Sequence, residues 1–461
     1  MANNIEWYKE HIDKYLHDTV YDTDSLMIEL PEEKWFKINP TRGIRKGQKV
    51  YDLEEDNSVL TQILREAYGE IKLDRMSIAS KPMLFRRRTV ASGGALYPNC
   101  LYVVTEREFC RHVYQYNPVY HTLHLLKKEK ADNDSSKVFF ILTDYYWRNW
   151  LKYRFFGYRL MQVDTGYMLC NLSVMLGRRN IAHEIHFSSE EQNMFQCLLD
   201  IDLNYEAVNA VIEIDEFGEC LPVVLDEIDC KIYDDWDSDE IPLYRIIEQK
   251  VSDEKIDYKM SLKKKLAVNT DYIRYRISPG GALMQSAGAV DKSELLKVLE
   301  ETAGVSELYE KKFGDIVLYI YCNKVQGVEN GFYRMELSGD RQLKLYKDVE
   351  NNIQNILKKK NFNLYEVPAI IFTAGNLEEY RKKYGYTGFK ILQTKIGFYS
   401  QLLSIVSAER KYYTHPILGY DAELIKKELG CQEDILNMIV WSEGKAEDRL
   451  SVAFYNLEKC L

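Results

Sequence analysis

Two long segments of the chain, residues 150–177 and 383–407, share a pattern of apolar positions interrupted by glycines. The apolar residues follow helical periodicity, so the pattern predicts two long helices. Five positions recur at an offset of 231: Lys152, Tyr153, Gly157, Gln162 and Gly166 become Lys383, Tyr384, Gly388, Gln393 and Gly397. Helical periodicity explains the apolar positions, but it does not explain this shared set of polar residues and glycines.

Shorter predicted elements repeat in the same order along the chain. The matching pairs are the helices at 58–69 and 293–304 (offset 235), the strands that begin at 101 and 318 (offset 217), and the strands that begin at 206 and 433 (offset 227). Offsets that drift by a few residues are typical of loop insertions in a duplicated chain. We therefore predict a tandem duplication, with a lead-in at 1–35, a first half at 36–225 and a second half at 226–461.

One offset falls sharply, from 235 to 217, so the second half lacks about 18 residues between its helix and its strand. In the first half the corresponding segment is a long predicted loop that contains FRRRTVASGGALYP, residues 85–98. The two halves are therefore expected to differ most at this loop.

Composition narrows the class of protein. The 461 residues are 46% hydrophobic and 13% aromatic, as in a globular protein of two or three domains. A net charge of −10 argues against a nucleic-acid partner, which needs a basic face. The nine cysteines show no metal-binding spacing, so we expect reduced, buried thiols, no metal site and a cytoplasmic location. Neither a signal peptide nor a membrane span is expected.

The motif R-T-x-x-S-G-G-A-L-Y-P at 88–98, followed by a strand, a hairpin and the Lys152–Tyr153 pair, resembles the nitroreductase-like FMN oxidases. More narrowly it resembles the azoline dehydrogenases of the streptolysin and microcin B17 type. The resemblance covers most of 35–215 and, more weakly, the second half. It implies an α+β, nitroreductase-like fold, with FMN in clefts at a dimer interface. A duplicated chain would form an intramolecular pseudo-dimer.

The family binds the FMN phosphate with an Arg-rich element and with basic residues after the last strand. Both halves offer such an arginine element, Arg42 to Arg45 and Arg274 to Ser278. After the last strand, the first half has acidic residues (Asp215, Glu216 and Glu219), whereas the second half has basic ones (Lys445 and Arg449). Since acidic residues would repel a phosphate, the second half is the better phosphate side.

In this family the Ser-Gly-Gly loop reaches the flavin held by the other unit, and only the first half keeps that loop. We therefore predict one complete FMN site, with the mirror site empty. Its predicted cofactor-binding residues are Arg274, Arg276, Lys445 and Arg449 of the second half, with Arg88, Ser92, Gly93 and Gly94 of the first. The glycines would let the backbone approach the flavin ring and donate N–H groups to it.

The resemblance assigns catalysis to Lys152 as the base and Tyr153 as a proton donor or relay, and we interpret Lys383–Tyr384 as a relic of the duplication. The predicted function is oxidation of thiazoline or oxazoline rings to thiazoles or oxazoles in a ribosomally made, post-translationally modified peptide. Expected partners are the modified precursor peptide and a cyclodehydratase complex. Two alternatives stay open: an NAD(P)H-dependent nitro or flavin reductase, and a non-catalytic scaffold subunit of a peptide-modifying complex.

Overall fold

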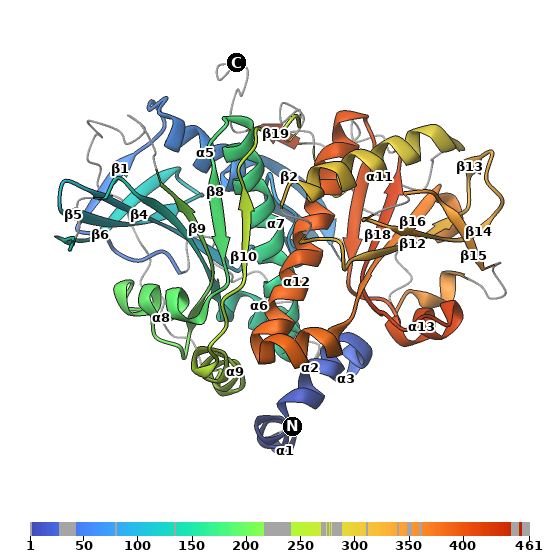
Figure 1. The fold of residues 1–461 in the computed structure, drawn as a ribbon, viewed down its shortest axis with the longest axis horizontal. Helices are drawn as coiled ribbons and strands as arrows, with labels where there is room; N and C mark the ends of the chain where they lie inside the picture. The colour runs from blue at the N-terminus through green and yellow to red at the C-terminus, as the bar shows by residue number, and fades with distance from the viewer. Residues whose placement is uncertain are drawn as a thin grey trace.

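The computed structural model describes residues 2–26, 43–78, 81–132, 135–215, 241–268, 273, 276, 278, 288–309, 312–338, 341–347, 353–358, 362–443 and 451–453. Two antiparallel sheets stand on either side of a central pair of long helices, α7 and α12 (Figure 1). Helices and sheets are thus combined in an α+β arrangement, as the sequence predicts. Among the described residues, no helix has the length and apolar character needed to cross a membrane.

The larger sheet has the strand order β1-β6-β5-β4-β7-β9-β8-β10, and every pairing in it is antiparallel. Its strands are β1 (Lys49–Asp52), β6 (Thr122–Lys130), β5 (Cys110–Asn117), β4 (Asn99–Arg107), β7 (Val138–Tyr145), β9 (Glu206–Ile214), β8 (His183–His186) and β10 (Lys259–Leu262). The predicted hairpin around residue 117 is confirmed as the β5–β6 pair.

The second sheet has the order β15-β14-β12-β16-β18-β17, again with antiparallel pairing throughout. Its strands are β15 (Lys344–Lys347), β14 (Gly331–Glu336), β12 (Val317–Cys322), β16 (Ala369–Gly375), β18 (Asp434–Ser442) and β17 (Tyr413–Ile417). This order matches β6-β5-β4-β7-β9-β8 strand for strand. Register shifts also correspond, between Leu142 and Thr143 and between Thr373 and Ala374, at the offset of 231. A tandem duplication would produce this arrangement.

The two long predicted helices are α7 (Gly157–Arg178) and α12 (Leu377–Glu409), and they pack against each other. The two helices cross at Gly166 and Gly397, which occupy corresponding positions in the repeat. A Cβ at Gly166 would collide with the carbonyl oxygen of Thr394, and a Cβ at Gly397 would collide with that of Val163. Both glycines are therefore required by the close approach of the two backbones.

Both long helices are buried on nearly all sides, which explains their apolar sequence pattern. Each is flanked by a shorter helix of its own half, α5 (Val59–Tyr68) on α7 and α11 (Lys292–Glu307) on α12. Ser58 caps α5 by accepting a hydrogen bond from the backbone N–H of Thr61, and Asp291 caps α11 in the same way. The predicted pair of short helices is thus present and similarly capped.

The described residues form further helices around this framework. They are α1 (Ala2–Glu10), α2 (Ile12–Tyr21), α3 (Thr23–Leu26), α6 (Tyr146–Tyr153), α8 (Ser189–Leu198), α9 (Pro242–Asp253) and α13 (Ala422–Leu429), with 3-10 turns η1 (Gly93–Ala95), η2 (Arg154–Phe156), η4 (Ile353–Ile356) and η5 (Leu364–Glu366). A two-stranded parallel sheet joins β11 (Val290–Asp291) to β13 (Val325–Gln326).

Some sequence expectations were wrong. Residues 70–88, expected as part of a long loop, form the hairpin β2 (Glu70–Ile78) and β3 (Lys81–Arg88), whose third strand is β19 (Ser451–Ala453). The partner β19 lies about 380 positions away, so no local pattern reveals the pairing. The thiols are also not all buried, since Cys197 is exposed.

Candidate active site

The predicted loop and the predicted catalytic pair meet in space. Gly94 has φ +62°, and a Cβ there would lie 2.6 Å from the hydroxyl oxygen of Tyr153 and would also collide with Lys152 Nζ. Lys152 and Tyr153 end helix α6, which follows strand β7, and both are partly exposed. The loop follows β3, so the sheet and α6 bring together groups that are about 60 positions apart in the sequence.

A carboxyl group that the sequence analysis missed holds the loop in place. Asp164, in the middle of α7, accepts a hydrogen bond from Ser92 Oγ at 2.6 Å and one from the backbone N–H of Gly93 at 3.3 Å. Ser92 Oγ in turn accepts the backbone N–H of Tyr97 at 2.9 Å. Burial raises the pKa of Asp164 to about 8, and the two hydrogen bonds from the loop act in the opposite direction.

Buried guanidinium groups surround the same loop. Arg88 is only 3% exposed, and its guanidinium lies 4.4 Å from the ring centroid of Tyr68 and 4.5 Å from that of Tyr97. Its Nε and Nη1 have no hydrogen-bond partner among the described residues. Arg148, also buried, donates to the carbonyl oxygen of Tyr97 at 2.6 Å.

Arg276 comes from the second half and reaches this first-half loop. Its guanidinium donates to the backbone carbonyl oxygens of Arg88, at 3.3 Å, and Val90, at 3.2 Å, and also to that of Thr89. Burial lowers the pKa of Arg276 to about 10. The chain thus places an arginine of one half directly against the loop of the other, where the sequence predicted a shared site.

The charges around the loop are unbalanced. Within the described residues, no carboxylate pairs with Arg88 or Arg276, and Asp164 favours its neutral form. Burying cations without an anionic partner is costly, and an anionic ligand bound beside them would offset that cost. Gly94 lets the backbone lie directly against Lys152 and Tyr153, and the orphaned nitrogens of Arg88 fit an anionic cofactor such as FMN.

Other predicted residues fall elsewhere. Arg274, Lys445 and Arg449, together with Arg42, Glu216 and Glu219, lie outside the described residues. Arg45 binds protein groups: its backbone N–H donates to Gln115 Oε1 at 2.7 Å, and its guanidinium donates to the carbonyl oxygen of Leu199. Asp215 is exposed and lies 3.6 Å from Lys137 Nζ.

Comparison with solved structures identifies the fold. A protein of Anabaena variabilis ATCC 29413, provisionally assigned as a nitroreductase, matches 92% of this chain and 98% of its own, with a TM-score of 0.67 and 16% identity. The chain has the nitroreductase-like fold. The predicted fold class is therefore confirmed, and the match extends over both sheets.

Weaker structural matches cover less of this nitroreductase-like chain. A chain of the E. coli microcin synthetase McbBCD complex with truncated pro-MccB17 bound matches 42% of this chain and 74% of its own, at 16% identity and a TM-score of 0.28. An enone reductase of gut-bacterial fatty acid saturation, CLA-ER, matches 42% of this chain and 98% of its own, at 14% identity and a TM-score of 0.26. Scores this low carry no functional argument. No protein-family model and no curated protein matches the sequence.

The second half of the nitroreductase-like fold repeats the Lys-Tyr geometry. Lys383 Nζ lies 5.0 Å from the ring centroid of Tyr384, and Lys152 Nζ lies 5.1 Å from that of Tyr153. The counterpart of Asp164 is Lys395, at the offset of 231.

Lys395 is buried and forms an ion pair within the second half. Its Nζ lies 2.5 Å from Asp315 Oδ1 and contacts the hydroxyl of Tyr380, while the rings of Tyr258 and Phe313 lie within about 6 Å. Burial lowers the pKa of Lys395 to about 8. Within the described residues, an internal ion pair thus replaces the loop contact.

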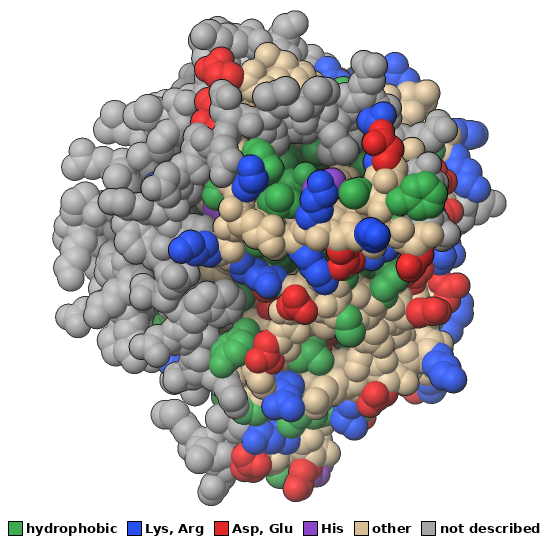
Figure 2. Space-filling view, turned by 90° about the vertical axis from the view of Figure 1, so that its left-hand side faces the viewer, with side chains coloured by type: hydrophobic (Ala, Val, Ile, Leu, Met, Phe, Trp, Pro, Cys, Tyr) green, Lys and Arg blue, Asp and Glu red, His purple; other side chains and the backbone are tan. Residues whose placement is uncertain are grey.

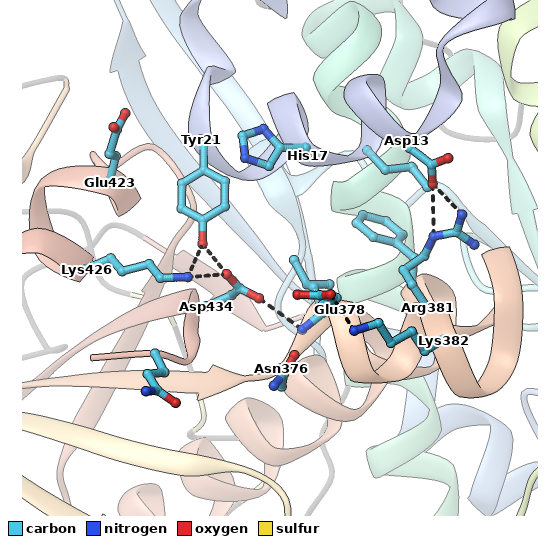
Figure 3. A pocket seen from close by; sticks show the side chains of 14 residues that line it. Asp13, His17, Tyr21, Asn376, Glu378, Arg381, Lys382, Glu423, Lys426 and Asp434 are labelled. Carbon is cyan, nitrogen blue, oxygen red and sulfur yellow. Dashed lines mark hydrogen bonds and ion pairs between the residues drawn. The ribbon is translucent and has the colours of Figure 1, made fainter. Parts of the chain in front are cut away.

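A cleft of about 920 Å³ lies away from this site, between α2, the start of α12 and α13 (Figure 3). Its charges are largely paired with one another: Asp13 with Arg381, Glu378 with Lys382, and Asp434 with Lys426 at 2.7 Å. Tyr21 completes the last pair by donating to Asp434. The cleft therefore leaves few uncompensated charges for a ligand.

The outer face of the first half carries charges of both signs. Figure 2 shows lysine and arginine side chains around an apolar hollow, with aspartate and glutamate side chains between and below them. The part of the chain that the structure describes contains no cluster of His, Cys, Asp and Glu able to hold a metal ion. His183 is buried and lies within hydrogen-bond distance of Ser173.

Proposed function

We propose that the chain is an FMN-dependent oxidoreductase that converts azoline rings of a modified precursor peptide to azoles. The observation that carries this proposal is the meeting of the Ser92–Gly94 loop with Lys152 and Tyr153, beside Arg88 and Arg276, which have no carboxylate partner among the described residues. Flavin chemistry needs a backbone that can approach a flat ring and cations for its anionic phosphate. Both are present at one place.

Each residue has a role in this proposal. Gly94 would present its backbone N–H group to the flavin ring, Gly93 would let the backbone approach the ring, and Arg88 and Arg276 would supply positive charge. Arg274, Lys445 and Arg449 remain proposed phosphate ligands, as the sequence predicts. When bound, FMN would accept the hydride from the azoline ring and return its electrons to dioxygen.

Lys152 and Tyr153 would handle the proton. Removing two hydrogens from an azoline requires a base for the proton on the ring α-carbon as the hydride leaves the neighbouring carbon. Lys152 Nζ, in its unprotonated form, would take that proton, and the Tyr153 hydroxyl would orient the ring or relay the proton. Because both side chains are partly exposed, a peptide can reach them.

The cofactor provides the first test. Purified protein should be yellow and should release about one FMN per chain on denaturation, because only the first half keeps the loop. Protein that is colourless and cannot be reconstituted with FMN would refute the proposal. Two FMN per chain would refute the single-site assignment.

The catalytic pair provides the second test. Lys152→Ala should keep FMN but lose about 10²–10⁴-fold in azoline oxidation, the usual contribution of a general base. Lys383→Ala is the matched control and should retain wild-type turnover. Rapid anaerobic bleaching of the flavin by NADPH, unaffected by Lys152→Ala, would instead indicate a nicotinamide-dependent reductase. A flavin-free chain that binds the cyclodehydratase would indicate a scaffold.

A further inference from the structure

Helix α7 carries a carboxyl group, that of Asp164, in a stretch of the helix whose residues are all buried. The side chain is 3% exposed, and α7 is buried continuously from Gly157 to Gly177. Burying a carboxyl group costs free energy unless its hydrogen bonds recover it. Among the described residues its hydrogen-bond donors are Ser92 and Gly93, and both belong to the glycine loop.

These bonds fix the loop from both sides. Ser92 Oγ accepts the backbone N–H of Tyr97, which lies after the loop, and donates to Asp164. Gly94, which follows Gly93 in the loop, packs against Lys152 and Tyr153. Its backbone lies in the left-handed region, at φ +62°. A shift of the loop away from Asp164 would therefore change the distance between Gly94 and the proposed catalytic pair.

The second half provides an internal comparison. There the corresponding position is Lys395, which binds Asp315. The carboxyl group is thus found where it binds the glycine loop, and a residue of opposite charge, bound to Asp315, stands at the equivalent position of the second half. General packing of the helix pair does not require a carboxyl at this position, because the second half packs with a lysine.

We propose that Asp164 is a positioning residue that holds the Ser92–Gly94 loop in the shape that binds the flavin and faces Lys152 and Tyr153. This inference rests on the proposed flavin-dependent function. Besides Ser92, the groups that bear on the Asp164 carboxyl are Asp144 at the end of β7, Tyr167 on α7 itself and Tyr68 on α5.

Two substitutions of Asp164 separate hydrogen bonding from mere space filling. Asp164→Asn keeps an acceptor for Gly93 and offers an N–H to the free lone pair of Ser92 Oγ, so FMN affinity should stay within about threefold of wild type. Asp164→Leu has similar volume without hydrogen bonds, so FMN should bind about tenfold or more weakly. FMN fluorescence quenching measures the affinity, and the visible flavin spectrum of the bound fraction should shift.

Two further variants complete the experiment. Ser92→Ala removes the same hydrogen bond without touching α7, so it should weaken FMN binding even if Asp164→Leu does not fold. Lys395→Met is the matched control in the second half and should leave FMN affinity unchanged.

Hydrogen exchange of the Gly93 amide in cofactor-free protein tests the loop contact independently. Faster exchange in folded Asp164→Leu supports the contact. Wild-type FMN affinity and spectrum in folded Asp164→Leu and Ser92→Ala would overturn the positioning role, although the proposed function would stand. Failure of the wild-type protein to bind FMN would overturn the proposed function and this role together, even if Gly93 exchange changed.

Discussion

The two halves of the molecule use the same strand order and the same kinked entry into the long helix, but they differ where that helix meets the loop. In the first half Asp164 binds the Ser92–Gly94 loop, and in the second half Lys395 binds Asp315. The scaffold is therefore conserved within the chain while the contents of the two sites have diverged. A repeated fold does not imply a repeated site.

The two halves also differ in backbone strain at the turn that follows the Lys-Tyr pair. The residue after Tyr153 is Arg154, with φ +48° and ψ −127°, and the residue after Tyr384 is Gly385, with φ +57° and ψ −142°. Both halves adopt the same unusual turn, but only the second uses the residue that adopts it without steric cost. Strain of this kind persists where the surrounding structure enforces it, and it is common at functional sites.

The largest effect is expected at the crossing that the halves share. Gly166→Ala and Gly397→Ala should each destabilise the protein by about 3 kcal/mol, because each new Cβ collides with a backbone carbonyl of the opposite helix. Chemical denaturation measures the change. Gly419→Ala, whose Cβ would meet nothing within 4 Å, is the control and should be nearly neutral. A large difference between the two crossing variants would contradict the equivalence of the two helices.

The buried charges should give the halves opposite responses to pH. Burial raises the pKa of Asp164 from 3.8 to about 8, so the folded protein keeps a proton that the unfolded chain releases. Its contribution to stability is greatest below about pH 4 and is lost as the pH rises towards 8. Burial lowers the pKa of Lys395 from 10.5 to about 8, so its contribution is greatest above about pH 10.5 and is lost as the pH falls towards 8.

Denaturation midpoints across these two pH ranges test the contrast. Asp164→Asn should flatten the fall in stability between about pH 4 and 8, and Lys395→Met should flatten the rise between about pH 8 and 10.5. Unchanged slopes in both variants would show that other groups control the pH dependence.

A smaller effect is expected at the strained turn. Arg154→Gly should stabilise the protein by about 1 kcal/mol, because relief of the positive φ exceeds the added entropy of the unfolded chain. Gly385→Ala should destabilise it by about 2 kcal/mol, since the new Cβ would also collide with the carboxylate of Glu254. Thermal unfolding measures both. Destabilisation by Arg154→Gly would mean that contacts of Arg154 outweigh its strain.

The smallest effect concerns a Tyr–Glu pair that both sheets contain. Tyr102 donates to Glu206 at 3.0 Å, and its counterpart Tyr319 donates to Glu433 at 3.0 Å. Tyr102→Phe should cost about 1–2 kcal/mol because Glu206 is fully buried, and Tyr319→Phe should cost less than about 1 kcal/mol because Glu433 keeps Arg334 and some solvent. If chemical denaturation gave equal losses in the free energy of unfolding for Tyr102→Phe and Tyr319→Phe, burial would not distinguish the two pairs.

Much of the fold was predictable because a duplication leaves matching patterns. The offset of 231 correctly paired the glycines that meet at the helix crossing. The match of residue 101 with 318 aligns Tyr102 with Tyr319, and the match of residue 206 with 433 aligns their partners Glu206 and Glu433. The approach of the glycine loop to Lys152 and Tyr153 also follows the predicted grouping. Motif and repeat are properties of residue order, so the sequence alone determined them.

Other features depended on which distant side chains the fold brings together. Apolar periodicity predicts that a helix is buried. It does not predict which groups face a single carboxyl within that helix, so the sequence does not reveal the role of Asp164. The carbonyls that Arg276 holds are nearly 190 positions away, and the third strand of the β2–β3 sheet is supplied by residues 451–453. Only the tertiary structure decided these pairings, because hydrogen bonds and ion pairs form between neighbours in space, and local sequence does not encode those neighbours.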